Sequence, residues 1–199
     1  RRLRVAFFST GDELRSIGTP LGAGQIYDSN RYTIHGMLAR LGVDSIDMGV
    51  VRDDPALIEK AFAEAAAVAD VVITSGGVSV GEADFVKDLL DRLGEVVFCK
   101  IAMKPGRPLA YGRIGKAHFF GLPGNPVSVM VTFYQFVRDA LLALSDRLAT
   151  LNDSMRAEQD LMVKLAEAQL EVRPVLRRLA DALDQNRSVA LDEIGRAHV

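Results

Sequence analysis

Residues 75–84 form a glycine-rich segment that could bind a phosphate group. Gly76 and Gly77 follow an apolar run at residues 71–73, and a helical pattern begins at about Asp84. Two adjacent glycines allow a turn with positive φ and let backbone N–H groups approach a ligand closely. The start of the helix would add unpaired N–H groups and the positive end of a dipole. The segment therefore predicts an anion site, in which Asp84 could face the ligand or its metal ion.

Four further polar clusters also come directly after predicted strands. They occupy residues 10–13, 52–54, 100–107 and 121–128. Ligands bind at the carboxyl edge of an open α/β sheet, so we expect all five clusters to contribute to one site. A second helix start, after Gly124 and Asn125, would also suit a phosphate group.

Charged side chains in these clusters point to an anionic ligand bound together with a cation. Three basic side chains favour the anion, namely Lys100, Lys104 and Arg107. Three carboxylates would repel an anion unless a divalent cation lay between them, namely Glu13, Asp53 and Asp84. Oxygen ligands and phosphate are the partners that Mg²⁺ prefers. The pattern therefore predicts a magnesium-assisted site for a phosphate-containing ligand.

Strands and helices alternate along the chain, which predicts an α/β domain with a largely parallel sheet and helices on both faces. Predicted strands cover residues 3–8, 45–51, 71–74 and 95–101. Residues 109–112 and 117–120 flank a turn at Gly115 and predict a hairpin, so the sheet would be mixed. Helices are expected after the N-caps Asn30, Asp54 and Asn125, the last two followed by proline. Gly42 would end the first helix.

Composition excludes several classes of protein. The chain has 199 residues, 49% of them hydrophobic, and a net charge of −2, which gives no electrostatic attraction for nucleic acid. It has no run of eighteen apolar residues, so we expect no membrane span. A single cysteine, Cys99, excludes an internal disulfide framework and favours a reducing, cytoplasmic location. The chain begins with Arg1 and enters a strand at once, so we expect it to be part of a longer protein.

Other catalytic motifs are missing from the sequence. It has no Ser-His-Asp arrangement, no paired cysteine ligands and no Gly-x-Gly-x-x-Gly fingerprint. His35 falls in a helical pattern and His118 in a strand, so we expect both to be structural. Cys99 lies in an apolar strand and is expected to be a core residue.

Five motifs follow one another within about residues 3–144: STGDEL (9–14), GQIYDSN (24–30), SGGVSVGEAD (75–84), KPGRP (104–108) and GLPGNP (121–126). In this order they resemble the molybdopterin molybdenumtransferase family, which includes bacterial MoeA and the E domain of gephyrin. The resemblance implies a three-layer α/β/α fold of the MogA type, in agreement with the α/β domain predicted above.

The resemblance also implies an activity. The family takes adenylylated molybdopterin and molybdate, splits off AMP with Mg²⁺ and leaves molybdenum on the dithiolene. It implies catalytic roles for Glu13, Asp53, Asp84, Lys100 and Lys104, with the three carboxylates serving the metal ion. Lys104, Pro105 and Ser128 match the molybdate position. Together with the glycine turn and the edge clusters, it leads us to expect substrate binding by Thr10, Ser75, Gly76, Gly77, Ser79, Gly81, Pro105, Arg107, Gly121, Pro123, Gly124, Asn125, Pro126 and Ser128.

The chain departs from the family after Leu144. Apolar residues recur at steps of three and four between Leu151 and Leu183, interrupted by Glu158 and Gln169, which predicts an amphipathic helix or coiled-coil seam. A bend at Pro174 is expected. We therefore expect a domain at residues 1–145, a helical extension at 146–190 and a disordered tail at 191–199.

The resemblance implies partners and leaves two alternatives. The full-length enzyme has further domains and forms a homodimer, and a MogA-type adenylyltransferase supplies its small-molecule substrate. One alternative is an adenylyltransferase of that type, whose Gly-Gly turn usually continues with Thr-Gly; Val78 and Ser79 here favour the transferase. The other is a non-catalytic scaffold. We expect residues 1–199 alone to bind the pterin nucleotide weakly and to turn over poorly.

Overall fold

The computed structural model describes residues 1–76, 89, 92–106 and 108–196. The chain divides into a unit at Arg1–Ala149 and a second unit at Thr150–Val199. The predicted division lies four residues earlier, at residue 145.

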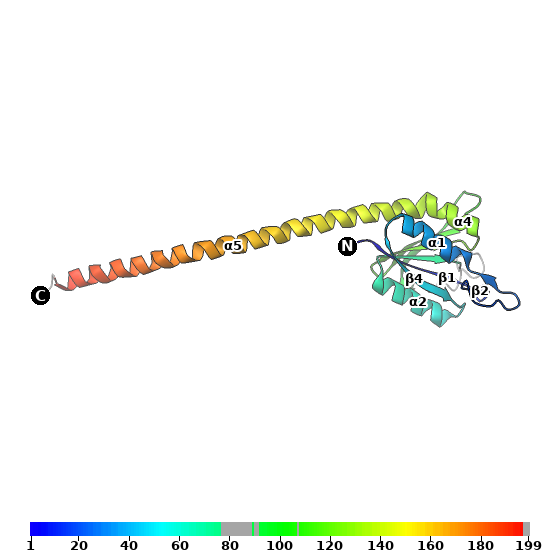
Figure 1. Cartoon of the computed structure of the whole chain (residues 1–199), viewed down its shortest axis with the longest axis horizontal. Coiled ribbons are helices and arrows are strands. Elements are labelled where there is room, and N and C mark those ends of the chain that lie inside the picture. The colour runs from blue at the N-terminus through cyan, green and yellow to red at the C-terminus, as the bar shows by residue number, and fades with distance from the viewer. Residues whose placement is uncertain (77–88, 90–91, 107, 197–199) are drawn as a thin grey trace. The chain divides into compact units, whose positions relative to one another are not determined.

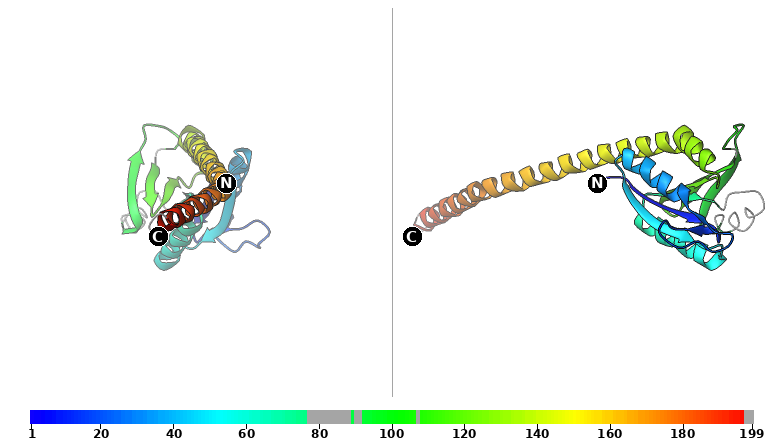
Figure 2. Two further views of the ribbon diagram at one scale, coloured as in Figure 1. Left: turned by 90° about the vertical axis from the view of Figure 1, so that its left-hand side faces the viewer. Right: turned by 45° about the vertical axis from the view of Figure 1, so that its right-hand side comes forward.

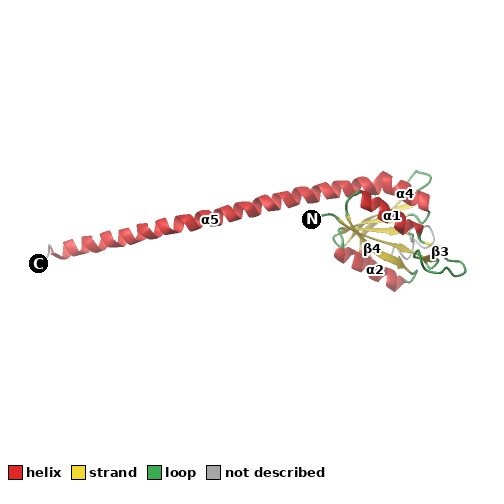
Figure 3. Ribbon diagram, viewed as in Figure 1, coloured by secondary structure: helices red, strands yellow, loops and turns green. Residues whose placement is uncertain are grey.

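A six-stranded sheet forms the centre of the first unit (Figures 1 and 3). Its strands lie in the order β4-β1-β5-β8-β7-β6, with these bounds: β1 Arg4–Thr10, β4 Asp44–Val51, β5 Val71–Ser75, β6 Gly94–Lys100, β7 Pro108–Ile114 and β8 Ala117–Leu122. Strands β4, β1, β5 and β8 are mutually parallel, and β7 pairs antiparallel with both β8 and β6. This confirms the prediction of a mostly parallel, mixed sheet.

The reversal at β7 determines which strand ends lie together. Because β7 is antiparallel to its neighbours on both sides, β6 runs in the same direction as β8, β5, β1 and β4. The carboxyl ends of these five strands therefore meet at one edge of the sheet. The five polar clusters of the sequence begin at this edge, although most of residues 75–84 lie outside the described part of the chain.

Helices cover both faces of the sheet, which gives the three-layer α/β/α fold (Figure 2). Alternate residues of β1 point to opposite faces, as the pleat of a strand requires. Val5 and Phe7 pack in a core with α1 (Ser29–Arg40), α4 (Pro126–Thr132) and the start of α5 (Arg138–Arg196). Ala6 and Phe8 pack in a second core with α2 (Pro55–Val68).

Two of the three predicted helix starts are confirmed. The Asp54 carboxylate accepts hydrogen bonds from two backbone N–H groups at the start of α2, and Asn125 does the same for α4. Each stabilises groups that have no partner inside the helix. The prediction for α1 is wrong, because Asp28 is its N-cap and Asn30 lies within the first turn. Gly42 follows the C-cap with φ +67°, as expected for a glycine that ends a helix.

Helix α5 supplies the second unit. After a π-helical turn at Phe133–Val137, α5 runs from Arg138 to Arg196 with Pro174 inside it. It includes residues 191–196, which the sequence analysis assigns to a disordered tail. The helical stretch Pro126–Ala168 contains a window of mean hydropathy 1.4, long and apolar enough to cross a membrane, of which 33% is buried. Core helices of soluble proteins have the same property, so one such helix is weak evidence for a span.

Candidate active site

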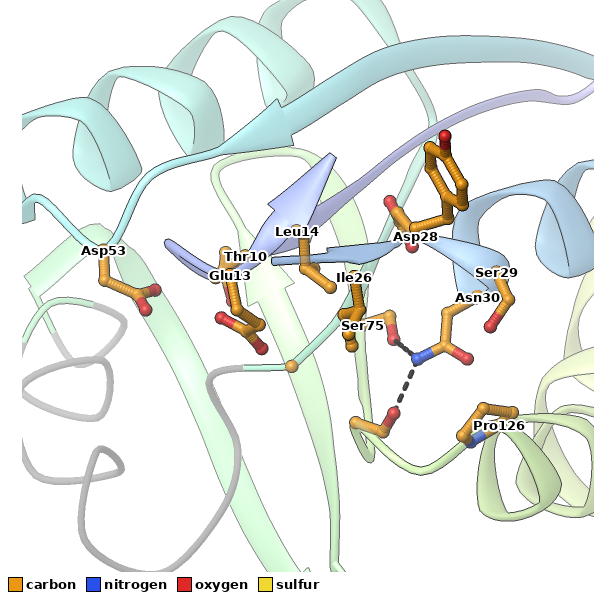
Figure 4. Close-up of a pocket in the computed structure, with 14 residues that line it drawn as sticks. Thr10, Glu13, Leu14, Ile26, Asp28, Ser29, Asn30, Asp53, Ser75 and Pro126 are labelled. Carbon is orange, nitrogen blue, oxygen red and sulfur yellow. Dashed lines mark hydrogen bonds between the residues drawn. The ribbon is translucent and has the colours of Figure 1, made fainter. Parts of the chain in front are cut away.

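A cavity of about 270 Å³ opens at the carboxyl edge of the parallel strands (Figure 4). The ends of β1 and β5, the start of α1 and the turn before α4 form its walls. The short parallel strands β2 (Leu14–Arg15) and β3 (Ile26–Tyr27) cover one side. The lining residues are Thr10, Gly11, Glu13, Leu14, Ile26, Tyr27, Asp28, Ser29, Asn30, Asp53, Ser75, Gly76, Gly124 and Pro126.

Asn30 connects three of these walls. Its Nδ2 donates to Ser75 Oγ at 2.9 Å and to the carbonyl oxygen of Gly124 at 2.7 Å (Figure 4). Ser75 Oγ in turn donates to the carbonyl oxygen of Pro123 at 3.4 Å. The side chain of Asn30 thus holds the start of α1 against the ends of β5 and β8. Asn30 makes these contacts from inside the first turn of α1, rather than from the N-cap position.

Two buried polar atoms of the cavity have no hydrogen-bond partner among the described residues. They are Thr10 Oγ1 and Asn30 Oδ1, on residues that are 8% and 9% exposed. Most buried polar atoms in proteins are paired, because an unpaired one has lost its hydration without compensation. Both residues are among those that line the cavity.

Carboxylates gather at the other end of the cavity. Glu13 and Asp53 both line it (Figure 4), and Asp12 exchanges backbone-to-carboxylate hydrogen bonds of 3.3 Å with Asp53. Burial raises the pKa of Asp53, and the charges of Asp12 and Glu13 raise it further. Such crowding is what a bound cation would relieve. Within the described ranges no group of three or more His, Cys, Asp or Glu side chains is placed to hold a metal, and the predicted third carboxylate, Asp84, lies outside those ranges.

Gly76 makes a turn that requires glycine. Its φ is +89°, and a Cβ at this position would lie 2.8 Å from the carbonyl oxygen of Thr10. The backbone after β5 therefore passes against the end of β1 with no room for a side chain. The predicted site residues that follow, Gly77, Ser79 and Gly81, lie outside the described residues.

The predicted basic loop does not line this cavity. Lys104 and Pro105 are exposed and border a separate, open depression of about 500 Å³. A Cβ on Gly106, whose φ is +101°, would meet Met103 Cε at 2.7 Å and Thr132 Oγ1 at 2.8 Å, so the loop packs on α4. Arg107 and the side chain of Lys100 lie outside the described part of the chain.

The remaining predicted residues surround the turn before α4. Gly121 and Pro123 are buried at the end of β8, and Gly121 pairs with Thr74 of β5. Asn125 caps α4 by accepting from the backbone N–H of Ser128 at 3.2 Å. The cavity therefore brings together seven of the predicted residues, namely Thr10, Glu13, Asp53, Ser75, Gly76, Gly124 and Pro126.

A partly buried ion-pair network next to the cavity is missing from the sequence predictions. Arg31 donates to both carboxylate oxygens of Asp47 at 2.8 Å, to Asp28 at 3.3 Å and to Ser16 Oγ at 2.7 Å. Burial disfavours the charged guanidinium, but the hydrogen bonds and charge of Asp47 outweigh this and raise the pKa of Arg31. The network fastens residues 14–28 to α1 and β4. The only sequence signal is an arginine three residues after Asp28, which is too common to indicate it.

Comparison with known proteins gives the family. Residues 6–143 match the family described as "Probable molybdopterin binding domain". The molybdopterin molybdenumtransferase of Haemophilus influenzae is 55% identical over 144 residues, which cover 72% of this chain and 36% of that protein. The molybdopterin molybdenumtransferase of Nostoc sp. is 43% identical over 148 residues, covering 72% of this chain and 34% of that protein. The chain thus spans about a third of the length of these curated relatives.

Solved structures agree with this result. A molybdopterin biosynthesis MoeA protein from Pyrococcus horikoshii has a TM-score of 0.67 at 39% identity, covering 74% of this chain and 36% of that one. The molybdenum cofactor biosynthesis protein B has a TM-score of 0.57 at 18% identity and shares the fold, with 75% of this chain and 98% of that one covered. Since the family match spans more than half of its residues, this chain belongs to the molybdopterin-binding domain family.

Proposed function

We propose that this chain is the substrate-binding domain of a molybdopterin molybdenumtransferase, which inserts molybdate into adenylylated molybdopterin and releases AMP. The observation that carries the proposal is the cavity at the carboxyl edge. It combines Thr10 and Asn30, each with a polar atom that has no partner among the described residues, with a glycine turn at one end and two carboxylates at the other. A ligand with polar groups and a phosphate linkage matches these features.

Within this proposal the acidic end would hold Mg²⁺. The donor set fits: Glu13 and Asp53 line one cavity, and burial, with the nearby charges of Asp12 and Glu13, raises the pKa of Asp53. Mg²⁺ is commonly held by one or two carboxylates together with substrate phosphates. When bound, it would offset the charge that develops on the pyrophosphate as AMP leaves. Asp84 is proposed as a further carboxylate of this site.

The chain's own residues would bind and orient the substrate. Asn30, fixed by Ser75 and Gly124, and Thr10 both line the cavity, and each has a polar atom without a partner among the described residues. Gly76 lets the backbone after β5 approach the ligand. Molybdate is proposed to bind at Lys104, Pro105 and Ser128, with Lys100 and Arg107 adding positive charge. Fixed donors and charges of this kind stabilise a transition state without reorganising.

Carboxylate variants of a complete enzyme containing this domain test the proposal. Asp53→Asn and Glu13→Gln should lower Mg²⁺-dependent AMP release from adenylylated molybdopterin by about 100-fold or more, if each serves the metal ion. Asp84→Ala should abolish release with the fold intact. Glu64→Gln, an exposed change on α2, is the matched control and should leave release unchanged. Full activity of Asp53→Asn would refute the assignment.

The isolated chain should bind the nucleotide weakly and turn over poorly, because we propose that neighbouring domains and a second subunit complete the active site. Incubation with adenylylated molybdopterin, Mg²⁺ and molybdate, followed by measurement of AMP, checks this. Rapid AMP release by residues 1–199 would contradict it.

The alternative function is adenylylation of molybdopterin. The relatives at 43% and 55% identity are named molybdenumtransferases, and the similarity to protein B at 18% extends to the fold alone. These identities favour the transferase, with an adenylyltransferase as the proposed supplier of its substrate. Consumption of MgATP with molybdopterin, and no consumption of the adenylylated form, would support the alternative.

A further inference from the structure

The exposed part of α5 has an apolar seam that the proposed function does not use. Its described members are Leu151, Met155, Met162 and Leu165, which are 52–64% exposed, with the acidic Glu158 between them. Successive positions are separated by four, three, four and three residues. The same steps continue through the helical residues 169, 172, 176, 179 and 183. The seam therefore spans more than four heptads, a length at which the repeat indicates a coiled coil.

The opposite side of this helix is polar. Asp153, Asp160 and Glu167 lie seven residues apart, and Asp153 pairs with Arg156 at 3.7 Å. A helix that is apolar on one side and charged on the other buries its apolar side against protein. The charges on the opposite side, and Glu158 inside the seam, count against a helix that spans a membrane.

We propose that the seam pairs with the same seam of a second copy of this chain, in the antiparallel direction. In an antiparallel pair, the first apolar position of a heptad on one helix lies opposite the second apolar position of a heptad on the other. A seam of this kind can therefore pair with the same seam of a second copy. The two polar seam positions determine the register. If residue 158 lies opposite residue 169, then 151 lies opposite 176, 155 opposite 172, and 162 opposite 165. Every apolar seam position from 151 to 176 then faces an apolar one.

Charge selects the antiparallel direction over the parallel one. In a parallel pair, Glu158 would lie against Glu158 of the second copy, and two like charges would be removed from water together. In the antiparallel register each Glu158 lies opposite position 169 of the other helix, so the two carboxylates are in different layers. A single polar layer commonly fixes the register of a coiled coil in this way.

The oligomeric state of the full 199-residue chain tests the proposal. Analytical ultracentrifugation should show a dimer that dissociates on dilution. Leu165→Glu should weaken the dimer by at least about 100-fold, because it buries a charge without a partner in the seam. The matched control is Leu170→Glu, which changes an exposed leucine of the same helix outside the seam and should leave the dimer intact. A monomer at high concentration, or equal effects of both variants, would overturn the proposal.

Disulfide trapping determines the direction. A Leu151→Cys chain mixed with a Leu176→Cys chain should form the mixed disulfide under mild oxidation. The unsubstituted chain, which contains Cys99, is the background control. Homodimeric disulfides of each variant, without the mixed product, would indicate a parallel pair and refute the antiparallel register. Circular dichroism of Leu165→Glu and Leu170→Glu should show equal helix content, which separates lost pairing from lost folding.

Discussion

At the scale of single residues, several groups in the site lower the stability of the folded protein. Asp53 is held beside Asp12 and Glu13, with a pKa that burial and these charges raise. Thr10 and Asn30 each keep a buried oxygen without a partner among the described residues. Such costs are typical of functional positions, where residues are retained for the ligand rather than for stability.

Asp53→Asn should make the empty protein more stable while reducing its activity. The folded pKa is raised, so the native state binds more protons than the unfolded state between the two pKa values, and wild-type stability falls as pH rises through that window. At pH 7 the variant should gain up to about 1 kcal/mol in free energy of unfolding, limited by solvent screening. The gain should vanish below about pH 4.

Urea denaturation at several pH values measures this gain. Glu64→Gln on the surface of α2 should show no comparable pH-dependent gain. A gain of Asp53→Asn that persisted at acid pH would mean that ionisation of the partly buried Asp53 carboxyl is not its cause.

Sequence reasoning at this scale succeeds where a residue acts on its chain neighbours. Asp54 and Asn125 cap their own helices, and both are predictable from the residues that follow them. Asn30, like Asn125, is an asparagine near the start of a helix. The partners of its side chain are Ser75 and Gly124, which are far away in the sequence. Local patterns contain no information about such partners, so its prediction as a cap is wrong.

At the scale of elements, the close approach of β1 and β5 at their carboxyl ends shapes the cavity. Gly76→Ala should lower the free energy of unfolding by more than about 2 kcal/mol, because alanine is strained at φ +89° and its Cβ would meet the Thr10 carbonyl. Gly124→Ala is the control, since its Cβ would have nothing within 4 Å. Thermal unfolding compares the two. Equal stabilities would show that the turn can relax.

The Arg31 network should determine how firmly residues 14–28 hold to the sheet. Arg31→Lys keeps the charge but cannot hydrogen-bond Asp28, Asp47 and Ser16 at the same time, which leaves the buried Asp28 with only the backbone N–H of residue 31 as a donor among the residues described. We expect a loss of about 2–4 kcal/mol. Hydrogen exchange of the Ile17 amide, which donates to the Tyr32 hydroxyl, should also become faster.

Arg40→Lys in the exposed last turn of α1 is the control for this variant. Unchanged exchange at Ile17 in Arg31→Lys would mean that the network does not hold the loop.

The elements themselves are largely predictable from the sequence. Hydrophobic runs and caps indicate the strands of the six-stranded sheet and helices α1, α2 and α4, and the hairpin turn at Gly115 indicates the reversal at β7. The position of the basic loop is not predictable. Lys104 follows a strand of the correct direction, yet β7 and β8 separate that strand from β5, so Lys104 borders a different depression.

At the scale of the whole domain, the two edges of the sheet have opposite roles. The carboxyl edge holds the cavity, and the amino edge is fastened by Asp70. This carboxylate accepts two hydrogen bonds from Arg1, of 2.7 and 2.6 Å, and one from the backbone N–H of Arg4 at 2.9 Å. The hydrogen bonds from Arg1 are the main reason that the pKa of Asp70 is lowered.

Low pH should reduce the stability that Asp70 contributes at the amino edge of the sheet. The lowered pKa means that Asp70 contributes stability above its unfolded pKa of about 4, and that this contribution is lost as pH falls through the folded pKa. Asp70→Asn should therefore cost about 1 kcal/mol at pH 7 and little at pH 2. Asp44→Asn is the control, because Asp44 meets Arg2 only at 3.9 Å. A pH-independent cost of Asp70→Asn would contradict the ionic explanation.

The oxygens of Thr10 and Asn30 that have no partner in the described part of the chain also predict how heat changes on binding. A ligand that bonds to them adds hydrogen bonds inside a preformed cavity, so its association should release heat and be opposed by entropy. Affinity for the nucleotide should then weaken on warming, as the van't Hoff relation requires for an exothermic reaction. Because Asn30 is already fixed by Ser75 and Gly124, little of that heat should be offset by ordering the side chain itself.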